Sequence, residues 1–147
     1  LIEMYNEDGI IVEPAGILAV TGLYQMDIDL TGKTVVCIVS GGNNDIYRTQ
    51  EIIERAKIYE GKKFYIRVEV PQISGSFATI LSIIEKEHEG LVSFTRYSNA
   101  KAINGYSSAL LGVEVTNKSI GKAIMNRLNQ AGISFRISKE SPVINEL

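Results

Sequence analysis

Residues 64–70 read FYIRVEV, and this stretch determines the architecture of the larger part of the chain. Its even-numbered positions are large and apolar, whereas the odd-numbered positions are Tyr65, Arg67 and Glu69. A two-residue period is typical of a β-strand that buries one face. We therefore expect a strand here, with its apolar side in a core.

The chain downstream of this strand alternates between helical and strand periods. Phe77, Ile80, Leu81 and Ile84 have the i, i+3, i+4 and i+7 spacing of an amphipathic helix. The polar segment over 98–108, with an Asn-Gly turn signal inside it, predicts a loop. The expected order is strands at 64–70, 92–97, 111–115 and 133–137, with helices from 77 to about Gly90 and from a Ser119 N-cap to Gly132.

This β-α-β-β-α-β order is the split βαβ, or ferredoxin-like, arrangement of an α+β domain. Two helices are expected to cover one face of a four-stranded antiparallel sheet. The other face would then be free to pack against a partner, and the tail after Ser138 is expected to be frayed.

A different pattern precedes residue 61. Residues 35–39 read VVCIV, a β-branched apolar run typical of a strand covered on both faces in a parallel sheet. A Ser-Gly-Gly-Asn loop ends this run, and an amphipathic helix is expected over 52–59. Upstream, Pro14 at a helix start predicts a mostly buried helix to about Leu23. We therefore expect an α/β segment over 1–61 and the α+β domain over 62–147.

Composition and charge argue against several classes of function. The formal net charge is −2, and Lys and Arg are scattered among Asp and Glu, so nucleic acid is not an expected partner. The single Cys37 fits a reduced, disulfide-free protein. No apolar stretch approaches the roughly 20 residues of a membrane span, so we expect a cytoplasmic protein with no membrane partner. No metal site is expected, and His88 is expected at a solvated helix end.

Three stretches resemble the biosynthetic threonine dehydratases: IVEPAGILAV at 11–20, VVCIVSGGNNDIYRTQEIIERAKIYEGKKFY at 35–65 and VPQISGSF at 70–77. Serine dehydratases and racemases share SGGN, but the long run after it makes the resemblance specific. The resemblance implies the C-terminal edge of a pyridoxal-phosphate fold type II domain, followed by an ACT-like regulatory domain. The implied parent enzyme deaminates L-threonine to 2-oxobutanoate and ammonia in isoleucine biosynthesis.

The resemblance also assigns contacts with pyridoxal phosphate to Ser40, Gly41, Gly42, Asn43 and Glu13. Ser40 would hydrogen-bond the pyridine nitrogen, and Glu13 would lie near the ring. A neutral hydroxyl leaves that nitrogen largely unprotonated, which favours elimination over transamination. A Ser-Gly-Gly after a strand is also, taken alone, an ordinary turn.

Two parts of the family's catalytic site are not found in this sequence. They are the Schiff-base lysine in a Ser-x-Lys context and the glycine-rich loop that binds the cofactor phosphate. The sequence starts with LIEMYNEDG, which resembles the middle of a helix leading into a turn. We therefore expect a piece of a longer protein, catalytically inert alone and binding pyridoxal phosphate weakly or not at all.

The resemblance places an amino-acid effector site in the loop between the first strand and first helix of the small domain. Its residues are Gln72, Ile73, Ser74, Gly75, Ser76 and Phe77. A glycine there lets a ligand approach the backbone, and N–H groups at a helix start can bind a carboxylate. The family commonly has Arg-Pro-Gly-Ala-Leu at 73–77, so the contacts differ in detail here. The alternative is that Ser74 is only an N-cap and Gly75 a turn residue.

Isoleucine is the implied inhibitor, with valine as its antagonist, in a homo-oligomer. Tyr97 and Tyr106 are candidates either for an effector pocket or for an interface. A free-standing amino-acid-binding or dimerisation module without catalysis is the alternative from another class. A serine dehydratase is the nearest enzymatic alternative.

Overall fold

The computed structural model describes residues 1–147 except 44, 87–88, 104, 140, 143 and 145–147, and describes only the backbone of 99–103. The chain divides into two compact units, Leu1–Ile53 and Glu54–Leu147. The expectations for His88 and for Asn104 of the turn signal concern residues outside the described part. Among the described helices, none combines the length and apolar character that crossing a bilayer requires.

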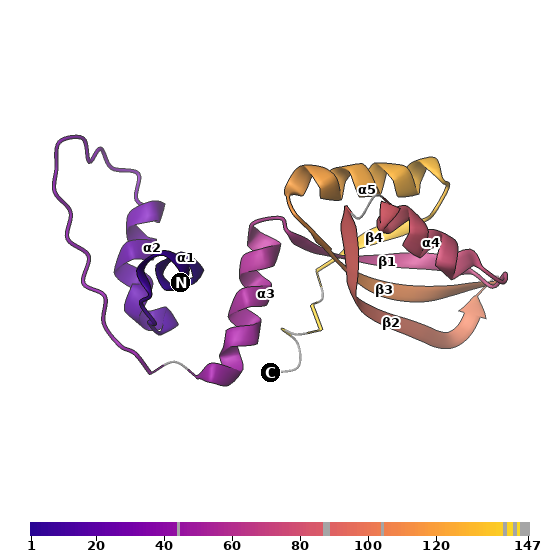
Figure 1. Ribbon diagram of the computed structural model, residues 1–147, viewed down its shortest axis with the longest axis horizontal. Helices are drawn as coiled ribbons and strands as arrows, with labels where there is room; N and C mark the ends of the chain where they lie inside the picture. The colour runs from indigo at the N-terminus through magenta and orange to yellow at the C-terminus, as the bar shows by residue number, and fades with distance from the viewer. Residues whose placement is uncertain (44, 87–88, 104, 140, 143, 145–147) are drawn as a thin grey trace. The chain divides into compact units, whose positions relative to one another are not determined.

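The second unit is a two-layer α+β domain (Figure 1). Its four strands form one antiparallel sheet in the order β2-β3-β1-β4. Two helices lie on the same face of this sheet (Figure 1). The elements are β1 (Lys63–Pro71), α4 (Ser76–Ile84), β2 (Gly90–Ile103), β3 (Tyr106–Val115), α5 (Lys118–Gln130) and β4 (Phe135–Ser138). The prediction of a small α+β domain with a four-stranded antiparallel sheet is confirmed.

The core lies between this sheet and its two helices. Ile66, Val68 and Val70 of β1 are at most 2% exposed, as their alternation in the sequence predicts. Ile80 and Ile124 meet them from α4 and α5. Burying each such side chain contributes about 1.5–3 kcal/mol, so the apolar face of β1 is the main anchor of the fold. The remaining buried members are Ile84, Ala109, Leu111, Val113, Val115 and Leu128.

The polar segment over 98–108 is not a loop, and that prediction was wrong. β2 continues through Ile103, β3 starts at Tyr106, and Ser98 pairs with Ser108 in the ladder. Polar side chains are compatible with a strand when the backbone groups pair with a neighbour. The register shifts twice in this ladder, between Val92 and Phe94 and again between Ser98 and Ile103.

The N-cap of α5 is Asn117 rather than the expected Ser119. The Asn117 side-chain oxygen accepts hydrogen bonds from the backbone N–H of Ser119 at 3.0 Å and of Ile120 at 3.2 Å. Asparagine satisfies two of the unpaired N–H groups of the first turn in this way.

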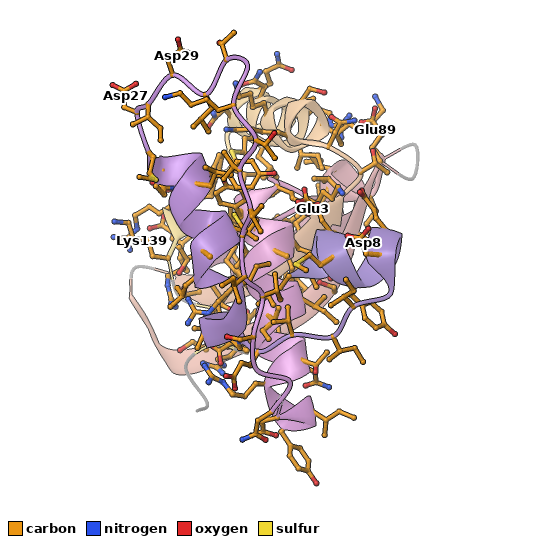
Figure 2. All side chains as sticks on the ribbon, turned by 90° about the vertical axis from the view of Figure 1, so that its left-hand side faces the viewer. Glu3, Asp8, Asp27, Asp29, Glu89 and Lys139 are labelled. Atoms are coloured by element: carbon orange, nitrogen blue, oxygen red, sulfur yellow. The ribbon has the colours of Figure 1, made fainter. Side chains whose placement is uncertain are left out.

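The first unit contains short helical segments joined by long coil. These are α1 (Ile2–Asp8), η1 (Pro14–Ile17) and α2 (Leu18–Gln25), and η2 (Ile46–Arg48) leads into α3 (Thr49–Tyr59). The helix expected after Pro14 is present, but α2 has no buried residue and Leu18 is 64% exposed, so the expected burial is wrong. Asp27 and Asp29 project from the coil after α2 (Figure 2), where the Thr31 side chain and backbone N–H hydrogen-bond to Asp29 and lower its pKa.

The strand expected over 35–39 is not formed. The segment has no strand partner among the described residues, and Val36 and Ile38 are 83% and 77% exposed. An apolar run becomes a strand only when neighbouring strands take up its backbone N–H and C=O groups. The described residues of the first unit supply no such neighbour.

Candidate functional site

Two of the predicted cofactor segments lie against each other in the first unit. The backbone N–H of Glu13 donates to the Gly41 carbonyl at 3.2 Å, and that of Ser40 donates to the Gly16 carbonyl at 3.3 Å. A Cβ at Gly16 would overlap the Ser40 carbonyl oxygen, and a Cβ at Gly41 would overlap the Glu13 carboxylate. Gly16 is therefore required for this close approach, whereas a Cβ at Gly41 would meet only side-chain atoms of Glu13.

The remaining predicted cofactor residues are open to solvent. Ser40, Gly42 and Asn43 are exposed, and the Ser40 hydroxyl makes no hydrogen bond to a described residue. Gly41 has φ 83°, a left-handed conformation that suits glycine. The structure thus brings Glu13 to the Ser40–Gly41 turn and leaves the Ser40 hydroxyl accessible.

The predicted effector loop is tied to the β2–β3 hairpin at its first residue. The backbone N–H of Gln72 donates to the Gly105 carbonyl at 2.9 Å, and its side-chain amide donates to the Ser107 hydroxyl at 3.2 Å. Ile73, by contrast, is 73% exposed. The loop is therefore fixed at one end and accessible in its middle.

Gly75, not Ser74, is the N-cap of α4. It has φ 85°, and no side chain caps this helix. The Gly75 carbonyl accepts from the Thr79 backbone N–H at 2.9 Å and from the Thr79 hydroxyl at 3.1 Å. The backbone N–H groups of Phe77 and Ala78 have no partner in the described part of the chain. Such orphan donors at a helix start favour an anionic group.

Two tyrosines lie at the same end of the domain as this loop. The Tyr97 ring packs edge-on against Phe77 with 5.9 Å between the centroids. Tyr106 is opposite Pro71 in the β1–β3 ladder. Both side chains are partly exposed, so they are placed to contact a molecule bound at the loop.

A buried polar network that the sequence did not reveal surrounds Glu54 of α3. One Glu54 carboxylate oxygen accepts from the Lys63 ammonium at 2.8 Å, and the other accepts from the Tyr65 hydroxyl at 2.5 Å and the Ser141 hydroxyl at 3.2 Å. Lys63 also contacts Glu114, at 3.2 Å. The Glu54 and Lys63 side chains are only 6% and 8% exposed. This network links Glu54 of α3 and Ser141 to β1 of the sheet.

The electrostatics of the network follow from these contacts. Burial lowers the pKa of Lys63, but the hydrogen bonds to Glu54 and Glu114 outweigh it, so the pKa is raised overall. Burial and donation to Glu54 both raise the pKa of the Tyr65 phenol. The hydrogen bond from Lys57 lowers the pKa of Glu114. Lys63 therefore stays charged and Tyr65 neutral at physiological pH.

The network also explains why the second unit begins at Glu54, upstream of residue 61, where the sequence suggests a boundary. In an amphipathic helix, a Glu that falls between the apolar positions ordinarily faces water. Glu54 is instead 5% exposed and bonded to β1. The last turns of α3 therefore pack as part of the small domain.

The fold and the loop define a small two-layer α+β domain with an exposed glycine at the start of its first helix. Within the described ranges, no group of three or more His, Cys, Asp or Glu side chains is placed to hold a metal ion.

Residues 54–147 match the family of the C-terminal regulatory domain of threonine dehydratase, and the chain belongs to this family. The match starts at the first residue of the second unit. The biosynthetic L-threonine dehydratase IlvA of Halalkalibacterium halodurans is 36% identical over 150 residues, covering 100% of this chain and 35% of that protein. The Bacillus subtilis protein of the same name is 38% identical over 148 residues, with 100% and 35% coverage.

The chain thus spans about a third of the length of the curated relatives it matches. Among solved structures, prephenate dehydratase from Streptococcus mutans has a TM-score of 0.45 and 19% identity, covering 53% of this chain and 41% of that chain. A similarity of that size does not define a common fold.

Proposed function

We propose that this chain is the C-terminal part of a pyridoxal-phosphate-dependent threonine dehydratase that deaminates L-threonine to 2-oxobutanoate and ammonia in isoleucine biosynthesis. The observation that carries the proposal is the family match over 54–147, together with relatives of that name aligned to the whole chain. The second unit is then the regulatory part, and the first unit belongs to the edge of the catalytic part.

The first unit fits one side of a pyridoxal phosphate site. Ser40 offers an exposed hydroxyl as a hydrogen-bond partner for the ring nitrogen, and Gly41 and Gly42 place no side chain in the way. Glu13 lies against the same turn. The cofactor supplies the electron sink for elimination, and a neutral Ser40 partner would leave its nitrogen largely unprotonated.

We propose further that an amino-acid effector, isoleucine in the first instance, binds at residues 72–77. The orphan N–H groups of Phe77 and Ala78 would take its carboxylate, because they carry the positive end of the helix dipole. The exposed Ile73 and Tyr97 offer apolar surface for its side chain. The sheet face without helices is proposed to pack against a second copy in a homo-oligomer.

Calorimetry with isoleucine tests the effector proposal. Valine at position 75 is strained at a φ of 85°, so Gly75→Val should abolish the heat of binding that the unchanged chain gives. Gly132→Val is the matched control, since Gly132 also has positive φ and open space around its Cα but lies in the loop after α5. Absence of heat from the unchanged chain, or equal heats from both variants, contradicts binding at this loop.

Assays of the complete enzyme test the proposal that this chain is the C-terminal part of a threonine dehydratase. The complete enzyme should convert threonine to 2-oxobutanoate and be inhibited by isoleucine. A version lacking residues 54–147 should retain conversion and lose inhibition. Inhibition that survives this deletion would contradict the regulatory role of the second unit.

A further inference from the structure

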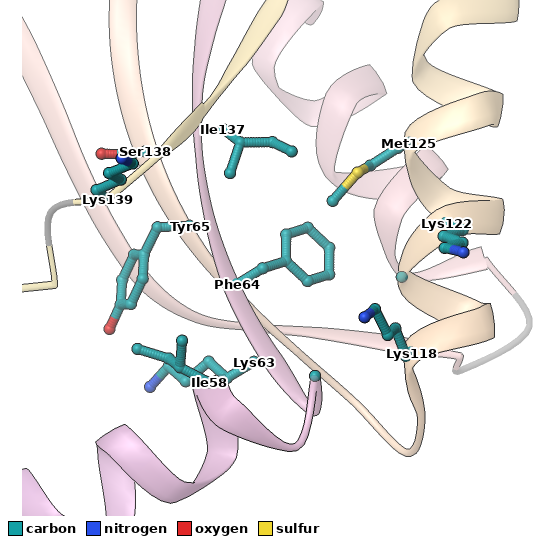
Figure 3. Close-up of a pocket in the computed structure, with 12 residues that line it drawn as sticks. Ile58, Lys63, Phe64, Tyr65, Lys118, Lys122, Met125, Ile137, Ser138 and Lys139 are labelled. Carbon is teal, nitrogen blue, oxygen red and sulfur yellow. The ribbon is translucent and has the colours of Figure 1, made fainter. Parts of the chain in front are cut away.

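A pocket of about 520 Å³ lies at the corner of the sheet where β1 begins and β4 ends. This is the end of β1 opposite the 72–77 loop. Figure 3 shows the Phe64 ring in its middle, with Ile137 and Met125 to one side and Ile58 and Lys63 to the other. The lining is completed by Gly61, Tyr65, Lys118, Gly121, Lys122, Ser138 and Lys139.

The floor of this corner pocket is apolar and accessible. Ile137 is 65% exposed on the edge strand, Ile58 is 38% exposed, and Phe64 and Met125 are half-buried. Gly121 permits the close packing of α5 over Phe64, because a Cβ there would come within 3.1 Å of the ring. An apolar body lying on this floor would remove those side chains from water.

Among the described residues that line the pocket, four are lysines and none carries a carboxylate. The Lys63 charge is already met by Glu54 and Glu114. Lys118, Lys122 and Lys139 are exposed, and no ion pair joins them to any described residue. Three ammonium groups without an ion pair to a described residue therefore surround an apolar floor. This arrangement favours an anionic ligand and disfavours a ligand that carries its own ammonium group.

We propose that this pocket binds a medium-length carboxylate with an apolar body and no ammonium group. The carboxylate contacts the lysine rim while the hydrocarbon lies over Phe64, Met125 and Ile137. The volume is within the range of small-molecule sites and exceeds what a four- or five-carbon side chain fills. Free amino acids should bind less well, because none of the described lining residues has an acidic side chain to meet their ammonium group.

The test compares octanoate with 2-aminooctanoate, which share a hydrocarbon chain and carboxylate and differ in the ammonium group. Each is titrated into the whole 147-residue chain and followed by NMR of the Met125 and Ile137 methyl groups. We expect octanoate to shift both methyl signals with saturation, and 2-aminooctanoate to bind at least tenfold more weakly. Equal binding of the two ligands, or no saturable shift with octanoate, overturns the proposal.

Two variants locate the binding site without disturbing the core. Lys122→Glu should weaken octanoate binding about tenfold because it reverses a rim charge. Lys33→Glu makes the same charge change at a residue that does not line the pocket and should have no effect. Ile137→Thr should also weaken octanoate binding, because it removes apolar surface from the pocket floor at an exposed position. Equal effects of Lys122→Glu and Lys33→Glu would overturn the assignment. The isoleucine experiment at Gly75 is independent of these results.

Discussion

Replacing Lys63 by Met should strongly destabilise the sheet of the second unit. The change removes the ammonium group that lies 2.8 Å from the Glu54 carboxylate, in a pair whose side chains are 8% and 6% exposed. Of its described partners, Glu54 would then keep the hydroxyls of Tyr65 and Ser141. Removing one partner of a buried ion pair costs about 3–5 kcal/mol of stability. Because Glu54 keeps two hydrogen bonds, we expect a loss of about 3 kcal/mol, near the lower end of that range.

The assay is native-state amide exchange at Ile66, which reports opening of the sheet in the whole chain. Lys62→Met is the matched control, because Lys62 is the adjacent residue and its pair with Glu60 is exposed, so the expected loss is about 0–1 kcal/mol. A loss below about 1 kcal/mol for Lys63→Met, or equal losses for the two variants, would refute the claim that the buried pair holds α3 to the sheet.

Three further predictions concern local features. Asn117→Ala should destabilise the second unit by about 1 kcal/mol through loss of the α5 N-cap, measured by urea denaturation. Gly16→Ala should abolish amide protection at Ser40, because its methyl group would overlap the Ser40 carbonyl, whereas Gly22→Ala has open space and should leave that protection intact. The folded-state pKa of Glu114 is lowered, so its contribution to stability is present above its ordinary pKa of 4.5 and lost as pH falls through the folded value. As the pH is lowered, the urea midpoint of Glu114→Gln should therefore fall less than that of the unchanged chain. An equal fall in both proteins would contradict this prediction.

The parts of the fold that the sequence predicts well are those with a strong local period. The alternation over 64–70 places Ile66, Val68 and Val70 in the core, and the helical spacing after Phe77 places Ile80 and Ile84 there. In both segments the buried residues recur at the period of the strand or helix, so the spacing of apolar residues identifies the buried face.

Features that depend on distant partners are not predicted. The hairpin over 98–108 is paired at Ser98 with Ser108 and at Ile103 with Tyr106, and the apolar run at 35–39 lacks a strand partner among the described residues. The spacing of apolar residues along a segment does not show whether another strand is available to pair with it. The family resemblance assigns Glu13 and Ser40 to the same cofactor site. In the structure, backbone hydrogen bonds join the segments that contain these two residues.

The Glu54 network and the corner pocket escape sequence reasoning for a related reason. Glu54 occupies a position on α3 that is polar in an amphipathic pattern, and one of its hydrogen-bond partners, Ser141, is 87 residues away. The rim lysines at 118 and 122 come from α5, and the one at 139 follows the end of the edge strand β4. Only the packing of those elements shows that the three charges surround one apolar surface.

The two edges of the sheet differ greatly in length. β4 has 4 residues and ends one edge, while β2 has 14 and ends the other. An unpaired row of backbone donors and acceptors is a template for another chain, and its risk of unwanted self-association grows with its length. Register shifts between Val92 and Phe94 and between Ser98 and Ile103 interrupt the regular ladder of β2. Such irregularities shorten the straight stretch available to a foreign strand, and so protect the longer edge of the sheet from aggregation.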